Sequence, residues 1–163
     1  MTPDMLKPIT NLVTWSATYS VGIKIIDDQH KELFNLVNEM YNHVSNDDEK
    51  AERAYFQSVI KQVLGYVKIH FATEETIMKR TKFQDYAVHK KVHDSFILSV
   101  VDIIKKYDER KRAPLIALTH FIKDWILTHI AIMDKQFFER LMNVSSRKPN
   151  GKLSVTQAAI AFS

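Results

Sequence analysis

The chain has 163 residues, of which 45% are hydrophobic and 26% charged, the composition of one globular domain long enough to bury a core. It contains no cysteine, so disulfides and thiolate metal ligands are excluded, and any metal must be bound by His, Asp or Glu. Three glycines and four prolines are too few for a turn-rich all-β fold. The formal net charge of +4, spread along the expected helix faces, does not indicate a nucleic-acid partner.

The sequence shows no targeting or membrane signal. No apolar run approaches about 18 residues, so neither a membrane span nor a membrane partner is expected. The N-terminal stretch MTPDMLKPITNLVTW lacks the charged-then-apolar layout of a signal peptide. We therefore expect a cytoplasmic protein, and we favour a monomer.

Taken in chain order, the sequence begins with an arm and continues through four segments that carry the helical period. Short polar connections separate the segments, and such connections place consecutive long helices antiparallel. We therefore predict an all-α fold, an up-down-up-down antiparallel four-helix bundle with an extended N-terminal arm packed on it and a C-terminal tail of unknown role. The expected units are the arm, 1–26, the bundle, 27–143, and the tail, 144–163, with helices at about 27–45, 48–81, 86–110 and 113–143.

Histidines and an acid replace apolar residues on the core faces of the first two helical segments. His30 lies in step with the apolar residues of the first segment. In the second segment, the next two steps of the apolar stripe fall on His70 and Glu74, where a bundle core would normally place Leu or Val. This stripe consists of Phe56, Ile60, Val63 and Val67.

The last two segments repeat the pattern. His89 and His93 lie on the apolar stripe of the third segment, four residues apart, so both rings can reach one point. The stripe of the fourth segment leads to His129. His43 and His120 serve as a control, because they lie about 140° and about 180° away from the core-facing histidines of their own segments. Five of the seven histidines therefore face the predicted core, at least one on each helix.

Each of these features has an ordinary explanation when taken alone. A single pair of histidines at i and i+4 is usually surface chance, a core histidine is usually a hydrogen-bonded packing residue, and a buried glutamate can be an ion-pair partner. Burying five imidazoles and an acid together without partners would cost several kcal/mol each, and metal binding removes that cost. We therefore predict a metal site. The stretch HKKVH lacks the glutamate of a zinc-protease helix, which excludes that alternative.

One further acid, Asp134, lies five residues after His129, about 140° away on an ideal α-helix. The apolar stripe shifts by one residue at the same place, because it resumes as Asp134, Phe138 and Leu141. One extra residue in the register is what a π-type bulge inserts, and such bulges gather at functional sites. We predict a π-bulge between His129 and Asp134.

The order and spacing of these residues resemble the hemerythrin family, and in particular the bacterial hemerythrins. The lead-in WSATYSVGIKIIDDQHKELFNLVN and the pair His70–Phe71 are also similar to that family. The resemblance spans about residues 12–143, and no ligand position departs from it. The positions that match the family's ligands are His30, His70, Glu74, His89, His93, His129 and Asp134.

The resemblance implies a non-haem di-iron centre, bridged by an oxo or hydroxo group, that binds O₂ reversibly. The implied ligands are His30 and His70 for one iron, His89, His93 and His129 for the other, and Glu74 and Asp134 as bridges. Two octahedral ions have twelve coordination positions, of which five imidazoles, two bridging carboxylates and one shared oxygen occupy eleven. The position that is left, on the iron with two histidines, is the expected place for O₂.

Two further sets of residues have expected roles. Trp15 and Tyr19 are expected to pack the arm over the bundle. A dry, apolar pocket should slow oxidation of the irons. Its candidate wall consists of Ile126, Trp125, Phe71 and Met133, for which plain core packing is the alternative role.

The function favoured by the sequence is O₂ storage, delivery or sensing without enzymatic activity. Ferritin-like di-iron enzymes use Glu-x-x-His pairs, and none occurs here. Two alternatives stay open: a di-iron enzyme acting on peroxide or nitric oxide, and an O₂-responsive signalling module. Besides O₂, the expected partner is an oxygen-using protein or a signalling protein. Iron, in preference to manganese or zinc, is implied by the resemblance alone, because the ligand types accept all three.

Overall fold

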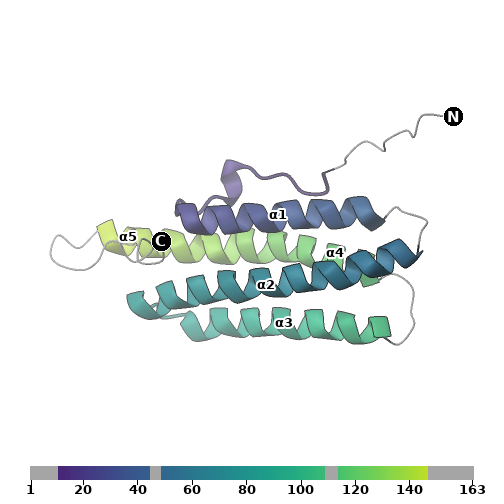
Figure 1. Ribbon diagram of the computed structural model, residues 1–163. Helices are drawn as coiled ribbons and strands as arrows, with labels where there is room; N and C mark the ends of the chain where they lie inside the picture. Colours follow the sequence, from purple (N-terminus) through teal and green to yellow (C-terminus); the bar gives the residue numbers. More distant parts are fainter. Residues whose placement is uncertain (1–10, 45–48, 109–113, 147–163) are drawn as a thin grey trace.

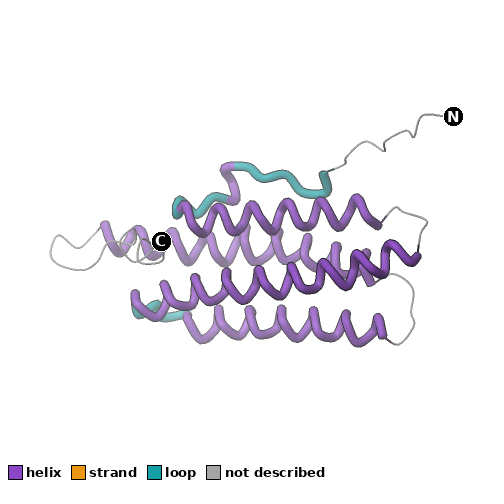
Figure 2. Tube along the Cα trace, in the orientation of Figure 1, coloured by secondary structure: helices purple, strands orange, loops and turns teal. Residues whose placement is uncertain are grey.

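A computed structural model of the chain describes residues 11–44, 49–108 and 114–146, and these residues are almost entirely helical (Figure 1, Figure 2). The elements are the 3₁₀ turn η1 (Ala17–Tyr19), α1 (Lys24–Val44), α2 (Glu49–Thr81), α3 (Tyr86–Asp108), α4 (Pro114–Trp125), the π-helical segment η2 (Ile126–Asp134) and α5 (Lys135–Ser146). α4, η2 and α5 follow one another without a break and together form the fourth rod of the bundle.

The four rods form an antiparallel up-down-up-down bundle, as predicted (Figure 1). α1 packs against α2 and α4, and α3 packs against the same two helices. Apolar residues recur every three or four positions along each rod, so each rod turns an apolar face toward the bundle axis. Side chains from all four rods can therefore meet at one level of the axis.

The turn between α2 and α3 sets the register of these two helices. α2 ends at Thr81, and Lys82 has a φ of 53°, the left-handed conformation common after a helix C-terminus. The amide of Phe83 donates to the carbonyl of Met78 (2.9 Å), which closes the helix end. Phe83 then packs edge-on against Phe137 (ring centroids 4.5 Å apart), and this contact ties the turn to α5.

The core consists of two apolar clusters with a layer of polar residues between them. The large cluster includes Leu33, Phe34, Val37, Phe56, Val63, Val67, Phe96, Leu118 and Ile122. The small cluster consists of Val21, Ile23, Ile26, Ile77, Met78, Phe137, Phe138 and Leu141. On α2, for example, Val67 of the large cluster precedes His70, and Ile77 of the small cluster follows Glu74. We refer to the buried histidines and acids between the clusters as the polar layer.

The arm is fixed to α1 by one amide side chain. Oδ1 of Asn38 accepts hydrogen bonds from the backbone amides of Leu12 (2.8 Å) and Val13 (3.0 Å), and its Nδ2 donates to the carbonyl of Val13 (2.9 Å). These three bonds satisfy backbone groups that a partly buried loop would otherwise leave unpaired. The described part of the arm therefore lies along α1 (Figure 1).

Aromatic residues of the arm cover the large cluster close to the polar layer. Trp15 and Tyr19 pack edge-on against Phe34, with ring centroids 5.3 and 4.8 Å apart. The Trp15 ring also lies 6.4 Å from the ring of His30. The arm thus shields the α1 side of the layer.

α1 begins at Lys24, three residues before the expected start. Asp27 lies inside the first turn, and its carboxylate reaches back to accept hydrogen bonds from the amide of Val21 (2.8 Å) and the hydroxyl of Ser20 (2.6 Å). Gly22, with a φ of 77°, makes the turn that leads into the helix. The pattern of apolar residues could not show this turn, because it is held by side-chain hydrogen bonds.

The remaining helix boundaries lie close to the expected ones. α2 begins at Glu49 and α3 at Tyr86, and the fourth rod runs from Pro114 to Ser146. The predicted ends of the first and third helices, at 45 and 110, lie outside the described residues. Most of the predicted tail, from 147 onward, and the first ten residues of the arm also lie outside them.

The fourth rod is more apolar than expected. Among the described residues, Leu115–Asn143 is the one helical stretch long and apolar enough to cross a membrane by length and composition, contrary to the expectation that none would be. This is weak evidence of a membrane span, because core helices of bundles meet the same criterion. Its His129 and Asp134 are buried among the other rods, so its apolarity is explained by core packing.

Candidate metal centre

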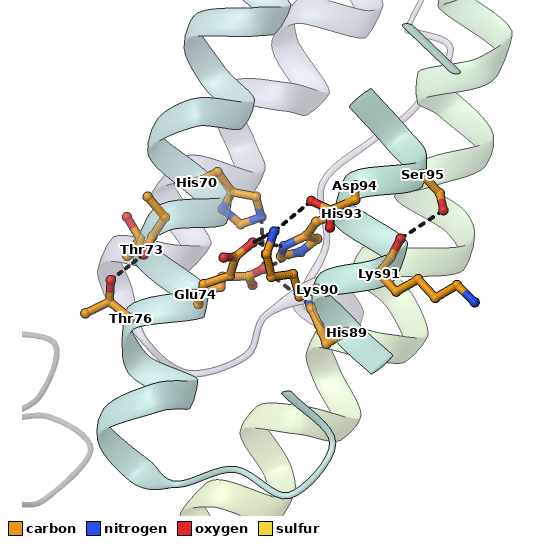
Figure 3. Close-up of polar contacts among 12 residues, drawn as sticks. His70, Thr73, Glu74, Thr76, His89, Lys90, Lys91, His93, Asp94 and Ser95 are labelled. Atoms are coloured by element: carbon orange, nitrogen blue, oxygen red, sulfur yellow. Dashed lines mark hydrogen bonds and ion pairs between the residues drawn. The ribbon is translucent and has the colours of Figure 1, made fainter. Parts of the chain in front are cut away.

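Seven polar side chains from all four rods meet in the polar layer. They are His30 from α1, His70 and Glu74 from α2, His89 and His93 from α3, and His129 and Asp134 from η2. All seven are at most 3% exposed. Figure 3 shows His70 and Glu74 of α2 facing His89 and His93 of α3. The structure thus brings together every residue of the predicted ligand set.

Three histidines surround Glu74 on one side of the layer. Oε2 of Glu74 lies 3.2 Å from Nε2 of His93 and 3.6 Å from Nε2 of His89. The Nε2 atoms of His93 and His129 are 3.2 Å apart. Donor atoms at adjacent corners of an octahedron with bonds of roughly 2.1 Å are about 3 Å apart. These four side chains therefore offer converging atoms for one metal ion, and we call them the three-histidine group.

Two histidines form a second group with the same glutamate. Nε2 of His70 lies 3.6 Å from Oε2 of Glu74, and Nε2 of His30 lies 3.3 Å from Oδ2 of Asp134. The ligand-type atoms of these four residues also converge within the span of one ion, and we call them the two-histidine group. Glu74 belongs to both groups, so two ions held there would share it.

Asp134 faces both groups with different oxygens. Its Oδ1 lies 3.0 Å from Nε2 of His129 and 3.2 Å from Nε2 of His89, whereas its Oδ2 faces His30. A carboxylate that turns one oxygen toward each set of imidazoles has the arrangement of a ligand that spans two ions. The layer therefore offers two overlapping groups of donor atoms, each of which could hold a metal ion.

The π-helical segment η2 explains why Asp134 reaches the layer. On an α-helix, five residues would place it about 140° away from His129. A π-helix closes its hydrogen bonds from i to i+5, so residues five apart lie about one turn apart on the same face. The prediction of a π-type irregularity between these residues is confirmed, although the π-helical conformation is longer than one inserted residue and covers Ile126–Asp134.

The imidazoles hold both carboxylates of the layer in the ionised form. Burial and the repulsion of Asp134 raise the pKa of Glu74, but His70 and the other histidines outweigh them and lower that pKa below its usual range. Burial also raises the pKa of Asp134, and the contact with His129 above all lowers it well below the usual value. Two negative charges in an apolar core require positive charge close by.

The histidines respond to the same balance in two ways. Burial lowers the pKa of His70 to about 4, so its ring is neutral at pH 7, which is the form that binds metals. Burial also lowers the pKa of His89, but Asp134 and Glu74 together raise it to about 9. Without a metal, a proton on His89 provides the positive charge that the carboxylates require. A bound metal ion would replace that proton.

Many polar atoms of the layer lack a hydrogen-bond partner among the described residues. They include both nitrogens of His30, Nε2 of His70 and of His89, and both carboxylate oxygens of Glu74 and of Asp134. A buried donor or acceptor left unpaired costs about 1–3 kcal/mol, and more when it is charged. Since imidazole and carboxylate are ligands that iron, manganese and zinc accept, the donor set fits bound metal ions.

The two control histidines lie outside the layer, as predicted. His43 stacks on Tyr55 with ring centroids 3.6 Å apart, and its Nδ1 lies 2.8 Å from the carbonyl of Glu39. His120 is exposed on the fourth rod. Helical position therefore separated layer histidines from surface histidines.

Three of the four candidate pocket residues are buried, and two of them stack on histidines of the layer. Phe71 stacks on His93 with ring centroids 3.8 Å apart, and Trp125 stacks on His129 at 4.0 Å. Ile126 is fully buried in the large cluster. Their packing is established by these contacts, and a role in enclosing O₂ stays a prediction.

Met133, the fourth candidate, is only partly buried. It lines a surface pocket of about 220 Å³ that reaches the edge of His89 and is flanked by the ion pair of Arg140 and Asp85 (2.8 Å). Met133 therefore belongs to a solvent-facing pocket beside the three-histidine group rather than to an enclosed wall.

Sequence reasoning missed three residues that contact the ligand set. Nδ1 of His70 lies 3.0 Å from Oε1 of Gln29, and Nδ1 of His93 lies 3.2 Å from Oε1 of Glu75. The ring of Tyr66 stacks on His70 with centroids 5.2 Å apart. Gln29 and Glu75 each adjoin a ligand residue in the sequence, and Tyr66 lies one turn before His70. Their closeness to ligand residues in the sequence was a signal that could have found them. No periodic pattern, however, shows which polar neighbour contacts a histidine ring.

The fold and the layer define a four-helix-bundle protein with a buried, histidine-rich cluster that could bind metal. A family model described as "Hemerythrin HHE cation binding domain" matches residues 21–141. The chain is 30% identical over 127 residues to the bacteriohemerythrin of Methylococcus capsulatus, covering 77% of this chain and 94% of that protein. The chain belongs to the hemerythrin family.

More distant relatives and solved structures agree with this assignment. The hemerythrin-like protein of Naegleria gruberi is 28% identical over 133 residues, covering 82% of this chain and 97% of that one. The crystal structure of a hemerythrin point mutant has a TM-score of 0.69 at 28% identity, covering 80% of this chain and 97% of that one. The residues that the family model matches, 21–141, include every residue of the polar layer.

Proposed function

We propose that this chain binds O₂ reversibly at a non-haem centre of two iron ions held in the polar layer. The observation that carries the proposal is the pair of unequal ligand groups, which share Glu74 and are spanned by Asp134. Membership of the hemerythrin family supports iron over the other divalent metals that the same donors accept. Two adjacent ferrous ions bound there would supply the electrons that a reversible bond to O₂ requires.

The unequal number of imidazoles decides where a small ligand binds. The three-histidine group offers one more ring nitrogen than the two-histidine group, while Glu74 and Asp134 serve both. An ion held by His30 and His70 would therefore have one donor fewer from the protein. Its open position is where we place O₂.

The surroundings of the layer favour reversible binding. The aromatic rings of Phe71 and Trp125 cover His93 and His129, and the arm covers the side of His30. A water-excluding site suppresses side reactions of a bound ligand, such as hydrolysis and proton leakage. A small neutral molecule bound in such a site can therefore dissociate chemically unchanged.

The charge of the donor set also favours carriage over oxidation chemistry. The layer contains five imidazoles and only two carboxylates. Ferritin-like di-iron proteins instead use a carboxylate-rich set. Fewer anionic donors stabilise highly charged iron less, so the oxidising states on which oxidation enzymes depend are less accessible here.

The test is a pair of spectra with metal analysis. Iron-loaded anaerobic protein should contain two iron ions per chain and should gain a charge-transfer absorption on exposure to air. That absorption should disappear on degassing, over many cycles. His129→Ala should abolish it because a ligand is lost. His120→Ala should leave it unchanged, because His120 lies on the same rod but is exposed.

Two other outcomes would redirect the proposal. Steady consumption of peroxide or nitric oxide in the presence of a reductant would favour a di-iron enzyme. A folded protein that stays colourless and metal-free after incubation with ferrous iron would contradict the proposal. Deleting residues 144–163 separates carriage from signalling: an unchanged O₂ affinity favours storage or delivery, whereas a changed affinity favours an O₂-responsive module.

A further inference from the structure

Two of the five layer histidines have a second hydrogen-bond partner, on the ring nitrogen that faces away from the layer. Nδ1 of His70 contacts Oε1 of Gln29 (3.0 Å), and Nδ1 of His93 contacts Oε1 of Glu75 (3.2 Å). The Nε2 atoms of both rings face the layer, where a metal ligand must be unprotonated. Nδ1 therefore carries the proton in each ring and donates it to the side-chain oxygen.

The partner of His70 is a neutral amide held in a fixed orientation. Nε2 of Gln29 donates to Oγ1 of Thr73 (3.3 Å), and that hydroxyl donates in turn to the carbonyl of Ile69 (2.8 Å). With its amide nitrogen engaged on Thr73, Gln29 turns its oxygen toward the imidazole. The ring of His70 is thereby oriented by an uncharged acceptor.

The partner of His93 is a carboxylate. Glu75 is 16% exposed, and the oxygen that accepts from His93 lies 3.9 Å from Nζ of Lys90. Lys90 is bound more closely by Asp94, at 2.7 Å. Glu75 therefore makes its shortest contact with the imidazole, and the ring of His93 is oriented by a charged acceptor.

Each ligand group also contains a histidine without such a partner. Nδ1 of His30 in the two-histidine group and Nδ1 of His129 in the three-histidine group are buried and have no hydrogen-bond partner among the described residues. Each group therefore contains one supported ring and one unsupported ring, and the three-histidine group contains His89 in addition. The groups also differ in the charge of the supporting side chain.

An imidazole that donates its N–H to a carboxylate becomes a stronger donor at its other nitrogen, and a neutral amide has a weaker effect. We propose that Glu75 and Gln29 are positioning residues that make the two metal positions electronically unequal. Glu75 makes His93 a strong donor to the ion of the three-histidine group. Gln29 leaves His70 a weaker donor to the ion with the open position.

This inference rests on the proposed function, because it requires an ion in each group. The ion beside His93 receives more electron density, so its ferric state is stabilised. The ion beside His70 has weaker protein donors and keeps more of its affinity for an additional ligand. The asymmetry thus favours ligand binding at the open position over irreversible oxidation of the ion that holds it.

The first test is Glu75→Gln, which keeps the size and an acceptor oxygen but removes the charge. The ratio of ferric to ferrous binding at the three-histidine group should fall about tenfold, which corresponds to a rise of about 59 mV in the midpoint potential for a one-electron couple. Glu75→Ala, which removes the acceptor as well, should lower ferrous affinity by about 10–100-fold. Spectroelectrochemistry and chelator competition on the full-length protein measure both quantities.

The reciprocal test is Gln29→Glu, which places a carboxylate on His70. It should lower the midpoint potential by a similar amount and accelerate oxidation of the ferrous protein in air. In ⁵⁷Fe Mössbauer spectra of the oxidised protein, Glu75→Gln and Gln29→Glu should change the signals of different irons. A role limited to holding the rings in place would leave both the potentials and these signals unmoved.

The matched control is Asp94→Asn. It makes the same change in charge one residue after His93, but the Asp94 carboxylate contacts Lys90 and no imidazole. Its effect on the potential should be less than about a third of that of Glu75→Gln. Equal shifts in these two variants would overturn the inference, because distant charge alone would then explain them. An unchanged potential in Gln29→Glu would overturn it as well, even if Glu75→Gln failed to bind iron.

Failure of this inference is distinguishable from failure of the proposed function. If the unaltered protein binds two irons but shows no reversible absorption with O₂, the proposed function is wrong, and the potentials of the variants still test the asymmetry. If the unaltered protein carries O₂ and the potentials of Glu75→Gln and Gln29→Glu do not move, the asymmetry is wrong and O₂ binding stands.

Discussion

The large cluster and the polar layer lie side by side on the same four rods, yet their side chains serve opposite purposes. In the large cluster, residues such as Leu33, Val37 and Val63 are fully buried, and the transfer of their apolar side chains out of water is favourable. In the layer, Glu74 and Asp134 are equally buried but have carboxylate oxygens without hydrogen-bond partners among the described residues. The cluster stabilises the fold, whereas the unpaired oxygens of the layer cost free energy that a bound metal ion would recover.

This difference teaches where to look for function in a bundle. Where histidine and acid interrupt the apolar stripe of a helix, the favourable free energy of burying an apolar side chain is lost. Only a bound ligand compensates for that loss. The small cluster packs on the other side of the layer, so the buried polar side chains lie between two apolar regions. Each of the following changes tests whether the apolar clusters determine stability and the polar layer determines metal binding.

The largest expected effect is on metal binding when a shared ligand is removed. Glu74→Leu keeps the approximate shape of the side chain, but it deletes the carboxylate that belongs to both groups. Metal affinity should fall by more than about 100-fold, since even indirect ligand support is worth 10–100-fold. The metal-free protein should unfold at a higher denaturant concentration, because the proton on His89 then balances one carboxylate, whereas two carboxylates share it in the unaltered layer. If the metal-free variant unfolds more easily, the layer contributes to folding and the division fails.

The next effect is on stability when the large cluster is truncated. Phe56→Ala should lower the free energy of unfolding by about 3–5 kcal/mol, because a buried ring is replaced by a cavity. Denaturant unfolding of the metal-free protein measures this loss, and the iron spectrum of the folded fraction should be unchanged. Leu98→Ala is the control: Leu98 is 69% exposed, so its loss should change stability by no more than about 0.5 kcal/mol. A lost iron spectrum in Phe56→Ala would show that the regions are coupled.

The layer should also bind metal in a pH-dependent manner. The raised pKa of His89, about 9 in the metal-free protein, means that its ring is protonated at pH 7 and must lose that proton to bind a metal ion. Affinity for redox-silent Zn²⁺ should therefore rise with pH, by about tenfold per unit from pH 7 toward pH 9, and then level off. His70 adds no dependence in this range, because its pKa is lowered to about 4. Titration calorimetry in buffers of different ionisation enthalpy would count the released protons, and an affinity independent of pH would contradict the account.

The smallest expected effect concerns Tyr66, which lies at the boundary of the two regions. Its ring packs in the large cluster and stacks on His70, and its buried hydroxyl has no partner among the described residues. Burial raises the pKa of this phenol well above its usual value, so it stays protonated. Tyr66→Phe should change the free energy of unfolding by less than about 1 kcal/mol, with no loss of the O₂ absorption. A tenfold shorter lifetime of that absorption would instead assign the hydroxyl to the bound ligand.

Much of this architecture was predictable from helical period alone. The spacing of His89 and His93, and of His70 and Glu74, determined which side chains face the bundle axis, because residues four apart lie on one face of an α-helix. The shift of the apolar stripe after His129 indicated the π-helical segment, since an inserted residue moves every later side chain around the axis. The face of a helix on which a side chain lies depends only on its position in that helix. It can therefore be predicted from the sequence of a single chain.

Other features were decided only by the packed bundle. Asp134 turns one oxygen toward each ligand group, Gln29 supports a histidine on α2 from α1, and Glu75 supports one on α3 from α2. The partly exposed position of Met133 likewise depends on how the fourth rod lies against α3. The amino-acid sequence by itself determined the rods and the faces on which the ligand-type residues lie. The rotation and axial offset of each rod against its neighbours, set by the packing of all four together, decided which atoms meet and which of them carry charge.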